Sequence, residues 1–317
     1  MKKSASFWVL LGTVLLLMGC AQAVSVSTDV SIIEPAVLTA TPAGDASADL
    51  AETQNQTGTT DSATDTATDE VGSTEQSVTS TKIPPATWQE WPVLPEVSAR
   101  AKDVYLLGQQ LGRDPHAFSV FGDCQSLPDV FMGMYDDSNY QLPAEFKALQ
   151  DTIEWYSGSF SRESVTLKKG TTVAAILWEG WVDDDNAQCE FGETPLECEI
   201  RLHNPSIVII NLGTHWELRN GLYLRKIIET LLEQGIVPII STKADSREGE
   251  GWVNEELVAI ANEYEVPVWN FWLAAQETEN GGMKMNDPMY LNDEGLEIHR
   301  LSGLQALDAV LRALNTP

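Results

Sequence analysis

The stretch Ser206-Ile-Val-Ile-Ile-Asn-Leu212 decides the fold, because it is a continuous apolar run of strand length. Such a run suits a strand that is buried on both faces of a parallel sheet. Working outward from it, shorter apolar runs predict further strands, and segments with helical spacing lie between them. The predicted strands are 117–121, 206–212, 236–240 and 266–271, and the predicted helices are 95–111, 143–156, 222–234, 253–264 and 301–314. This alternation predicts an α/β fold: a three-layer α/β/α sandwich with a parallel sheet.

The loops that follow the strands are expected to hold the working residues, because ligands of such sheets bind at the carboxyl ends of the strands. Three loops matter in this respect: those after Phe121, Leu212 and Phe271. The first of them contains Gly122-Asp123-Cys124, which reads as a strand running into a nucleophile turn. We therefore expect the three loops to converge on one cleft.

The N-terminus predicts export. Lys2 and Lys3 precede an apolar run from Phe7 to Met18, which is too short to span a bilayer and has the charge order of a secretory signal. The run ends in Leu17-Met18-Gly19-Cys20, which resembles the lipobox of bacterial lipoproteins. Residues 1–20 are thus predicted to be a lipoprotein signal, with Cys20 lipidated and the chain anchored to the outer face of the cell membrane. An uncleaved membrane anchor is the alternative, and it too exports the chain.

Residues 21–85 differ in composition from the rest of the chain. Thr, Ser, Ala, Asp and Glu dominate, no aromatic residue occurs, and no Lys or Arg lies between Lys3 and Lys82. Such a segment buries too little apolar surface to offset its ordering entropy, so we expect a disordered tether. The net charge of -28 argues against nucleic acid as a partner, because phosphate binding needs clustered Lys and Arg. Residues 86–317 remain, enough for one domain with a substantial core.

Several blocks, in this order, resemble those of the SGNH (GDSL-type) hydrolases. They are Gly122-Asp123-Cys124, Gly158 in "YSGSF", Leu212-Gly213-Thr214-His215, and Asp287-Pro-Met-Tyr290-Leu-Asn-Asp-Glu-Gly295. The resemblance covers nearly all of 117–317 and implies a flavodoxin-like fold with ester hydrolysis by a Ser-His-Asp triad, often on acylated sugars or lipids. It also implies that Asp123, Gly158 and Gly213 lie at the oxyanion or cleft positions.

The catalytic positions depart from the family pattern. Cys124 stands in place of the Ser, His215 in place of the oxyanion Asn and Tyr290 in place of the base His, whereas Asp287 matches. A tyrosine, with a pKa of about 10, is mostly protonated at neutral pH and is a poor base. A thiol needs less help, because its pKa is about 8.5 and its intrinsic nucleophilicity is high. A Cys that lacks a partner imidazole is therefore a weaker nucleophile, but it is still able to react.

Alternative roles are open for the residues that could rescue catalysis. His215 could donate a hydrogen bond to an oxyanion or face Cys124 as its base. His299 could supply the missing base or could simply cap or pack the last helix. Ser126 could be a displaced nucleophile or a hydroxyl that satisfies the turn. Cys124 itself could be a reactive free thiol or a small buried residue in the place of a Ser.

Cysteine spacing predicts a disulfide. Cys189 and Cys198 flank a short polar loop, and an exported chain permits disulfides, so we expect one bridge between them and a free thiol at Cys124. A metal site that includes His203 is the competing interpretation, although its spacing fits none of the usual zinc patterns.

Other conspicuous residues also have two interpretations. Lys243 and Asp245 follow a predicted strand and could line the cleft. The run Asp183-Asp184-Asp185 is either solvated or a calcium site. Four tryptophans could stack on sugars or serve the core: Trp178, Trp181, Trp269 and Trp272.

These features predict a membrane-tethered, extracytoplasmic SGNH-like domain without a cofactor or a metal. The first functional hypothesis is an esterase or acyl-transfer enzyme acting on an acylated carbohydrate or another cell-surface ester. The second is a catalytically impaired domain that retains the cleft and binds a glycan or envelope component. A third is a scaffold joined to another envelope protein.

Overall fold

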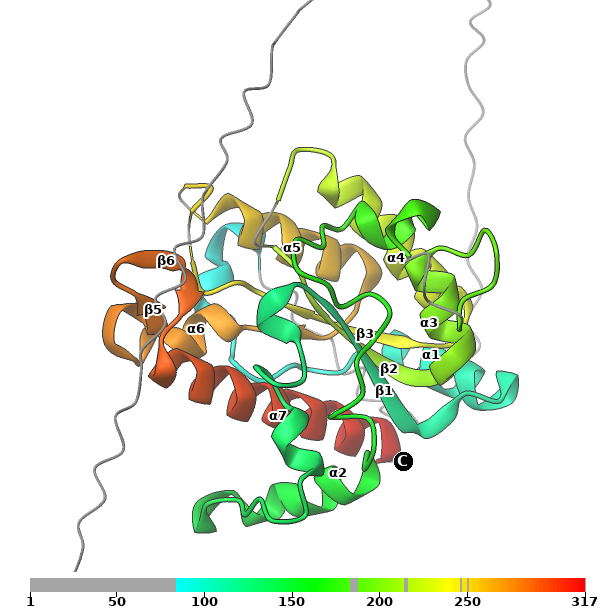
Figure 1. The fold of residues 1–317 in the computed structure, drawn as a ribbon, viewed down its shortest axis with the longest axis horizontal. Coiled ribbons are helices and arrows are strands. Elements are labelled where there is room, and N and C mark those ends of the chain that lie inside the picture. Colours follow the sequence, from blue (N-terminus) through cyan, green and yellow to red (C-terminus); the bar gives the residue numbers. More distant parts are fainter. Residues whose placement is uncertain (1–83, 183–187, 214–215, 246, 250, 317) are drawn as a thin grey trace, which may run out of the picture. The chain divides into compact units, whose positions relative to one another are not determined.

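A four-stranded parallel sheet in the order β1-β2-β3-β4 forms the centre of the fold (Figure 1). The computed structural model describes residues 84–182, 188–213, 216–245, 247–249 and 251–316. The strands are β1 (Asp114–Gly122), β2 (Pro205–Asn211), β3 (Val237–Ser241) and β4 (Val268–Trp269). The first six residues of β2 and all of β3 are buried, as the continuous apolar runs predict. The prediction of an α/β fold with a parallel sheet is therefore confirmed.

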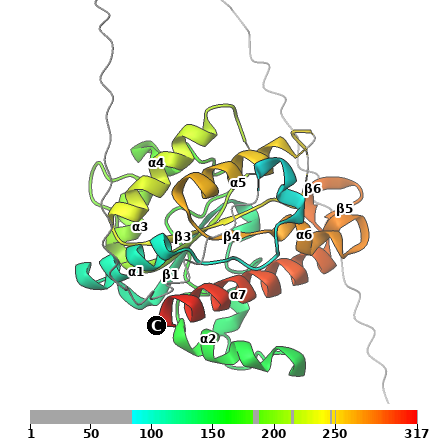
Figure 2. The ribbon, with the colours of Figure 1, turned by 180° about the vertical axis from the view of Figure 1, so that it is seen from behind.

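Crossover helices join the strands. Because the strands lie in sequence order and such connections are right-handed, α4 and α5 fall on the same side of the sheet. Figures 1 and 2 show them there, with α7 on the opposite side. The helices are α1 (Ala99–Leu111), α2 (Gln150–Trp155), α3 (Pro195–His203), α4 (Asn220–Glu233), α5 (Trp252–Tyr264), α6 (Phe271–Gln276) and α7 (Asp293–Asn315).

Local chemistry sets several of these boundaries and corrects two predictions. The predicted strand 266–271 is shorter, because the side chain of Asn270 accepts a hydrogen bond from the amide of Leu273 at 3.3 Å and starts α6 at Phe271. The last helix begins at Asp293 rather than at 301, because Asn292 caps it through the amide of Gly295 at 2.8 Å.

Other elements were not predicted at all. Helix α3 begins with a capping box in which the side chains of Thr194 and Glu197 bond each other's backbone N–H groups. The block 287–295, for which no strand was predicted, contains β6 (Asp287–Leu291), which pairs antiparallel with β5 (Met283–Lys284). This hairpin forms a separate two-stranded sheet, and α7 follows it directly in the chain.

The segment before α1 is held at the carboxyl end of β4. Asn270 is fully buried, and its side-chain amide donates to the carbonyl oxygens of Trp88 at 3.1 Å and Trp91 at 2.8 Å. This fixes the short 3-10 helix Pro85–Glu90 beside α5 and α6. Within the described part of the chain, no helix combines the length and the apolar character that crossing a membrane requires.

Candidate functional site

The loop after β1 is a tight turn built around Gly122. A Cβ atom at Gly122 would lie 2.2 Å from the Ser126 hydroxyl oxygen, so the loop can fold back only because this residue has no side chain. Asp123 is buried, and its carboxylate accepts from the amide of Gln125 at 3.0 Å, which starts the 3-10 turn Cys124–Ser126. The turn leaves Cys124 partly exposed and Ser126 buried.

The thiol of Cys124 is not activated by its surroundings. Burial raises its pKa, and the carboxylate of Asp123 raises it further. Lys169 and the backbone N–H groups of Cys124 and Gln125 act in the opposite direction but do not reverse the shift. Within the described residues no hydrogen bond joins the sulfur of Cys124 to a histidine. At neutral pH the group is therefore a protonated thiol.

Asn211, at the end of β2, connects two of the predicted site residues. Its side-chain amide donates to the hydroxyl oxygen of Ser126 at 2.9 Å and lies 2.9 Å from Nε2 of His299. Both amide protons are thereby used, so Nε2 of His299 is the acceptor and its proton sits on Nδ1. The hydroxyl of Ser126 accepts a hydrogen bond here, and among the described residues it forms no hydrogen bond with a histidine. Sequence reasoning missed Asn211, although its position as the polar residue near the end of an apolar strand was a usable signal.

His299 is almost fully buried. It lies on α7, is 1% exposed, and its ring packs against three aromatic rings, those of Phe131, Trp269 and Phe271, at centroid distances of 4.3, 5.3 and 4.5 Å. Its Nδ1 has no hydrogen-bond partner among the described residues. Burial, and to a lesser extent the charge of Arg300, lowers the pKa of His299 to about 3. This is the packing role that the sequence left open, and it makes His299 a neutral ring at physiological pH.

The side chain of Gln125 binds the loop to the β5–β6 hairpin. Its amide nitrogen donates to the carbonyl of Met289 at 3.1 Å, and its oxygen accepts from the amide of Leu291 at 3.0 Å. This places the hairpin next to the turn, and Leu291 lines a small cavity there. Gln125 was not among the predicted site residues.

Asp287 and Tyr290 lie on this hairpin but not in that cavity. Asp287 is exposed, and Tyr290 is partly buried with the ammonium of Lys284 5.8 Å from its ring centre. No hydrogen bond between described residues joins either side chain to Cys124. His215 and Asp183–Asp185 lie outside the described residues, as do Cys20 and the predicted signal and most of the predicted tether.

Lys243 and Asp245 do line the cavity, together with Asp123, Asn211, Gly213 and His299. The ammonium of Lys243 donates to the carbonyl of Gly213 at 3.0 Å and to Asp245 at 3.1 Å, and it also pairs with Glu248. The cavity holds about 30 Å³, so it accommodates a water-sized group. Gly158 is elsewhere: its amide donates to Asp136 at 2.8 Å, so that N–H group is not available for an oxyanion.

A much larger groove of about 820 Å³ opens beside this cavity, and we call it the cleft groove. The two share Ala244, Asp245 and Met283 as lining residues. The cleft groove offers the ring of Trp272, the cations Arg247 and Lys284, and the amides Gln89 and Gln276. Trp272 packs edge-on against the buried Trp88, with ring centroids 4.7 Å apart.

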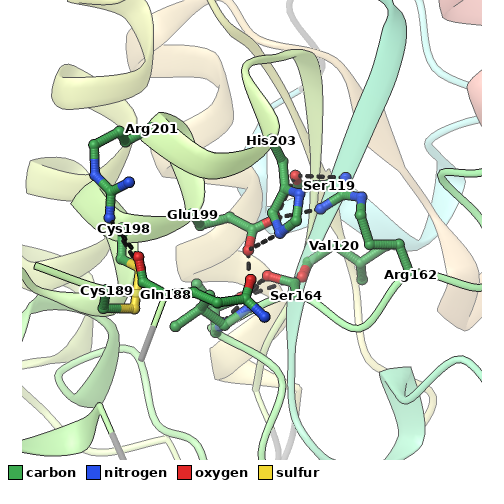
Figure 3. Close-up of polar contacts among 12 residues, drawn as sticks. Ser119, Val120, Arg162, Ser164, Gln188, Cys189, Cys198, Glu199, Arg201 and His203 are labelled. Atoms are coloured by element: carbon green, nitrogen blue, oxygen red, sulfur yellow. Dashed lines mark hydrogen bonds and ion pairs between the residues drawn. A yellow bond between two sulfur atoms is a disulfide. The ribbon is translucent and has the colours of Figure 1, made fainter. Parts of the chain in front are cut away.

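The predicted disulfide is confirmed, since Cys189 and Cys198 are bonded (Figure 3). Its setting differs from the prediction, because Cys198 is a buried residue of α3 rather than part of a polar loop. Both sulfurs are in the bond, so neither is a thiolate ligand for a metal, and His203 faces Glu199 instead with Nε2 3.6 Å from its carboxylate.

Figure 3 also shows that Glu199 organises a buried polar cluster. Its carboxylate is fully buried and accepts from the hydroxyl of Ser119 at 2.6 Å, from Arg162 at 2.8 Å and from the amide of Val165 at 2.8 Å. Burial lowers the pKa of His203, while Glu199 raises it and Arg162 lowers it. Because its oxygens are occupied by protein donors, we interpret this cluster as a structural tie between β1, α3 and the segment 162–165.

The four tryptophans divide between the two predicted roles. Trp269 is a core residue, whereas Trp272 lines the cleft groove, and Trp178 and Trp181 lie together on another surface. No family model, curated protein or solved structure matches the chain.

Proposed function

We propose that residues 86–317 form an SGNH-like domain with a three-layer α/β/α arrangement, held outside the cell by a lipidated Cys20. In this proposal the domain binds a glycan of the cell envelope, one that carries ester groups, in the cleft groove and does not hydrolyse it efficiently. Support for the family comes from the order of the blocks and from their positions: Gly-Asp-Cys begins at the last residue of β1, Gly213 follows β2, and Asp287–Gly295 precedes and enters α7.

One observation carries the choice of binding over catalysis: each described group that could do the chemistry is engaged or unactivated. The pKa of the Cys124 thiol is raised, and the hydroxyl of Ser126 accepts a hydrogen bond from Asn211. His299 is neutral, stacked between rings and bonded to Asn211. A base must reach the nucleophile's proton, either directly or through one water, and among the described residues no hydrogen bond joins His299 to Cys124 or to Ser126.

The cleft groove has the chemistry of a sugar site. An aromatic ring covers the apolar face of a pyranose, and amide and cationic donors bind its hydroxyl and acyl oxygens. Trp272 supplies the ring, and Gln89, Gln276, Arg247 and Lys284 supply the donors. The small cavity beside the groove, which Asp123 lines, has room for a water molecule only. It is too small for a whole sugar ring.

The test is calorimetric titration of the full chain with soluble glycan fragments of the bacterial cell envelope, in O-acetylated and de-O-acetylated forms. We expect saturable binding that weakens about tenfold, equivalent to about 1.4 kcal/mol, in Trp272→Ala. Gln276→Ala removes an exposed donor from the same groove and should weaken binding without disturbing the core. Trp178→Ala, an exposed tryptophan outside the groove, is the matched control and should bind normally.

Two outcomes would contradict the proposal. Absence of saturable binding for both forms would exclude this glycan class from the cleft groove. Rapid release of acetate, abolished by Cys124→Ala, would show instead that the domain is an esterase.

A further inference from the structure

The chain segment that precedes α1 forms one wall of the cleft groove. We call residues 84–93 the wall segment. Trp88 and Gln89 of this segment line the groove together with Trp272, which lies far along the chain. Both belong to the 3-10 helix Pro85–Glu90, which is drawn in cyan in Figure 2 and lies next to α5 and α6. The groove is therefore assembled from two distant parts of the sequence.

Asn270 holds the wall segment in place from the end of β4. It is fully buried, and its side-chain amide donates to the carbonyl oxygens of Trp88 at 3.1 Å and Trp91 at 2.8 Å. Its backbone amide donates to the carbonyl of Val93 at 3.1 Å, and its side-chain oxygen accepts from the hydroxyl of Thr242 at 3.0 Å. A buried amide whose donors and acceptor are all used is rigid. The backbone of Trp88 is thus fixed relative to the sheet.

The ring of Trp88 lies against both Gly251 and Trp272. It is 3% exposed, and its centroid lies 4.7 Å from that of Trp272, with an angle of 73° between the ring planes. Such edge-to-face pairs are favourable and have a defined geometry. A Cβ atom at Gly251, where φ is +76°, would come within 2.9 Å of the Trp88 ring. The lack of a side chain at Gly251 therefore lets the Trp88 ring fit closely at this place.

The orientation of the Trp272 ring depends on packing. The backbone of Trp272 is held by hydrogen bonds, since its amide donates to the hydroxyl of Thr242 at 3.0 Å and its carbonyl accepts from Gln276 at 3.3 Å. These bonds fix the backbone and leave the ring free to rotate. Among the described residues, no hydrogen bond holds the indole N–H of Trp272, and Trp88 is the aromatic ring that contacts it.

We propose that Trp88 is a positioning residue, which holds the ring of Trp272 in the orientation that stacks on the ligand. This inference rests on the function proposed above, binding of a glycan in the cleft groove. Trp88 exposes too little surface to be a stacking platform itself. Without it, the Trp272 side chain would distribute over the three staggered wells of χ1, so about a third of the molecules would present the ring correctly. The affinity would then fall about threefold.

The first experiment is a double-mutant cycle, measured by calorimetric titration of the full chain with the O-acetylated glycan fragments. Trp88→Ala should weaken binding about threefold. In the Trp272→Ala background the same change should have no further effect, because the ring that Trp88 positions is absent. Trp88→Phe, which keeps an aromatic partner, should restore most of the affinity, and Trp178→Ala is the control that should bind normally.

The second experiment needs no ligand. In the chain labelled with 5-fluorotryptophan, the fluorine NMR signal of Trp272 is identified by its loss in Trp272→Phe. We expect one narrow signal in the natural chain and in Trp88→Phe, and a shifted or broadened signal in Trp88→Ala. The signal of the core residue Trp269 should stay unchanged in Trp88→Ala, which shows that the fold is intact.

The outcomes separate this inference from the proposed function. Equal affinity of the natural chain and Trp88→Ala, additive losses in the cycle, or an unchanged Trp272 signal in Trp88→Ala would each overturn the positioning role and leave glycan binding standing. No binding by the natural chain, together with a broadened Trp272 signal in Trp88→Ala, would end the proposed function and support the positioning of the ring.

Discussion

The buried imidazole of His299 makes the stability of the domain depend on pH, and removing it should remove a defined part of that dependence. In the folded state burial lowers its pKa to about 3, whereas in the unfolded chain it has the ordinary value of 6.5. As the pH falls below 6.5 the unfolded chain takes up a proton at this position and the folded chain does not. Protonation therefore favours unfolding, and the stability that is present above pH 6.5 is lost as the pH falls towards 3.

The magnitude follows from the unfolded-state titration alone, because the folded group stays neutral throughout the range tested. Between pH 7 and pH 5 the linkage amounts to about 2 kcal/mol, at about 1.4 kcal/mol for each pH unit below the unfolded pKa. The free energy of unfolding of the natural chain should thus fall by about 2 kcal/mol more than that of His299→Gln over this interval. Carboxylates and the other histidines titrate in both proteins and cancel in the comparison.

The assay is urea unfolding of both proteins at pH 5, 6, 7 and 8, followed by tryptophan fluorescence and by circular dichroism to test for two-state behaviour. Between pH 7 and pH 8 little proton uptake occurs in either state, so the difference between the two proteins should stay nearly constant there. Equal losses of stability in both proteins between pH 7 and pH 5 would mean that His299 is not buried as described, and the case against it as a base would fail.

Three further predictions concern other parts of the chain. Replacing both bridged cysteines, Cys189→Ser with Cys198→Ser, should lower the free energy of unfolding by about 2–3 kcal/mol, because the bridge closes a loop of about ten residues; unchanged urea midpoints would contradict this. Alkylation of Cys124 by iodoacetamide should still accelerate as the pH rises beyond 9.0, the ordinary pKa from which this thiol is raised, whereas a plateau near pH 7 would reveal an activating partner. Arg162→Met should destabilise the domain by about 3–5 kcal/mol by leaving the buried Glu199 unpaired, and adding Glu199→Leu should restore part of the loss; the urea midpoint of the double variant falling below that of the single variant would oppose this account of the cluster.

The sequence predicted the sheet well because its strands are continuous apolar runs. Runs such as those of β2 and β3 fit only strands that are covered on both faces of the sheet. The sequence predicted the ends of elements less well where a single polar side chain decides them, as Asn270 does for α6 and Asn292 does for α7. The hairpin β5–β6 is held by the side chain of Gln125, which is distant in sequence. No local sequence pattern therefore predicts the hairpin. The capping box of α3 was a local signal that could have been used.

In the candidate site, too, some features could be predicted from the sequence and others could not. Loops after parallel strands predicted that Asp123, Gly213, Lys243 and Asp245 would lie near one another, since topology alone brings strand ends together. Side-chain orientation was not predictable in this way. Whether His299 faces the nucleophile or the core depends on how α7 packs against the rings of Phe131 and Trp269, which is a property of the assembled interior.

The central claim is that the cleft binds its ligand without efficient turnover, and the most direct test is the initial rate of aryl acetate hydrolysis by the full chain and by Cys124→Ala, each checked for folding. The raised pKa of Cys124 and the neutral, enclosed ring of His299 predict equal rates, both close to the rate in buffer. A rate for the natural chain that exceeds that of Cys124→Ala a hundredfold or more would contradict the claim, because general acid–base catalysis typically contributes about 10²–10⁴-fold and would require a working base beside the thiol.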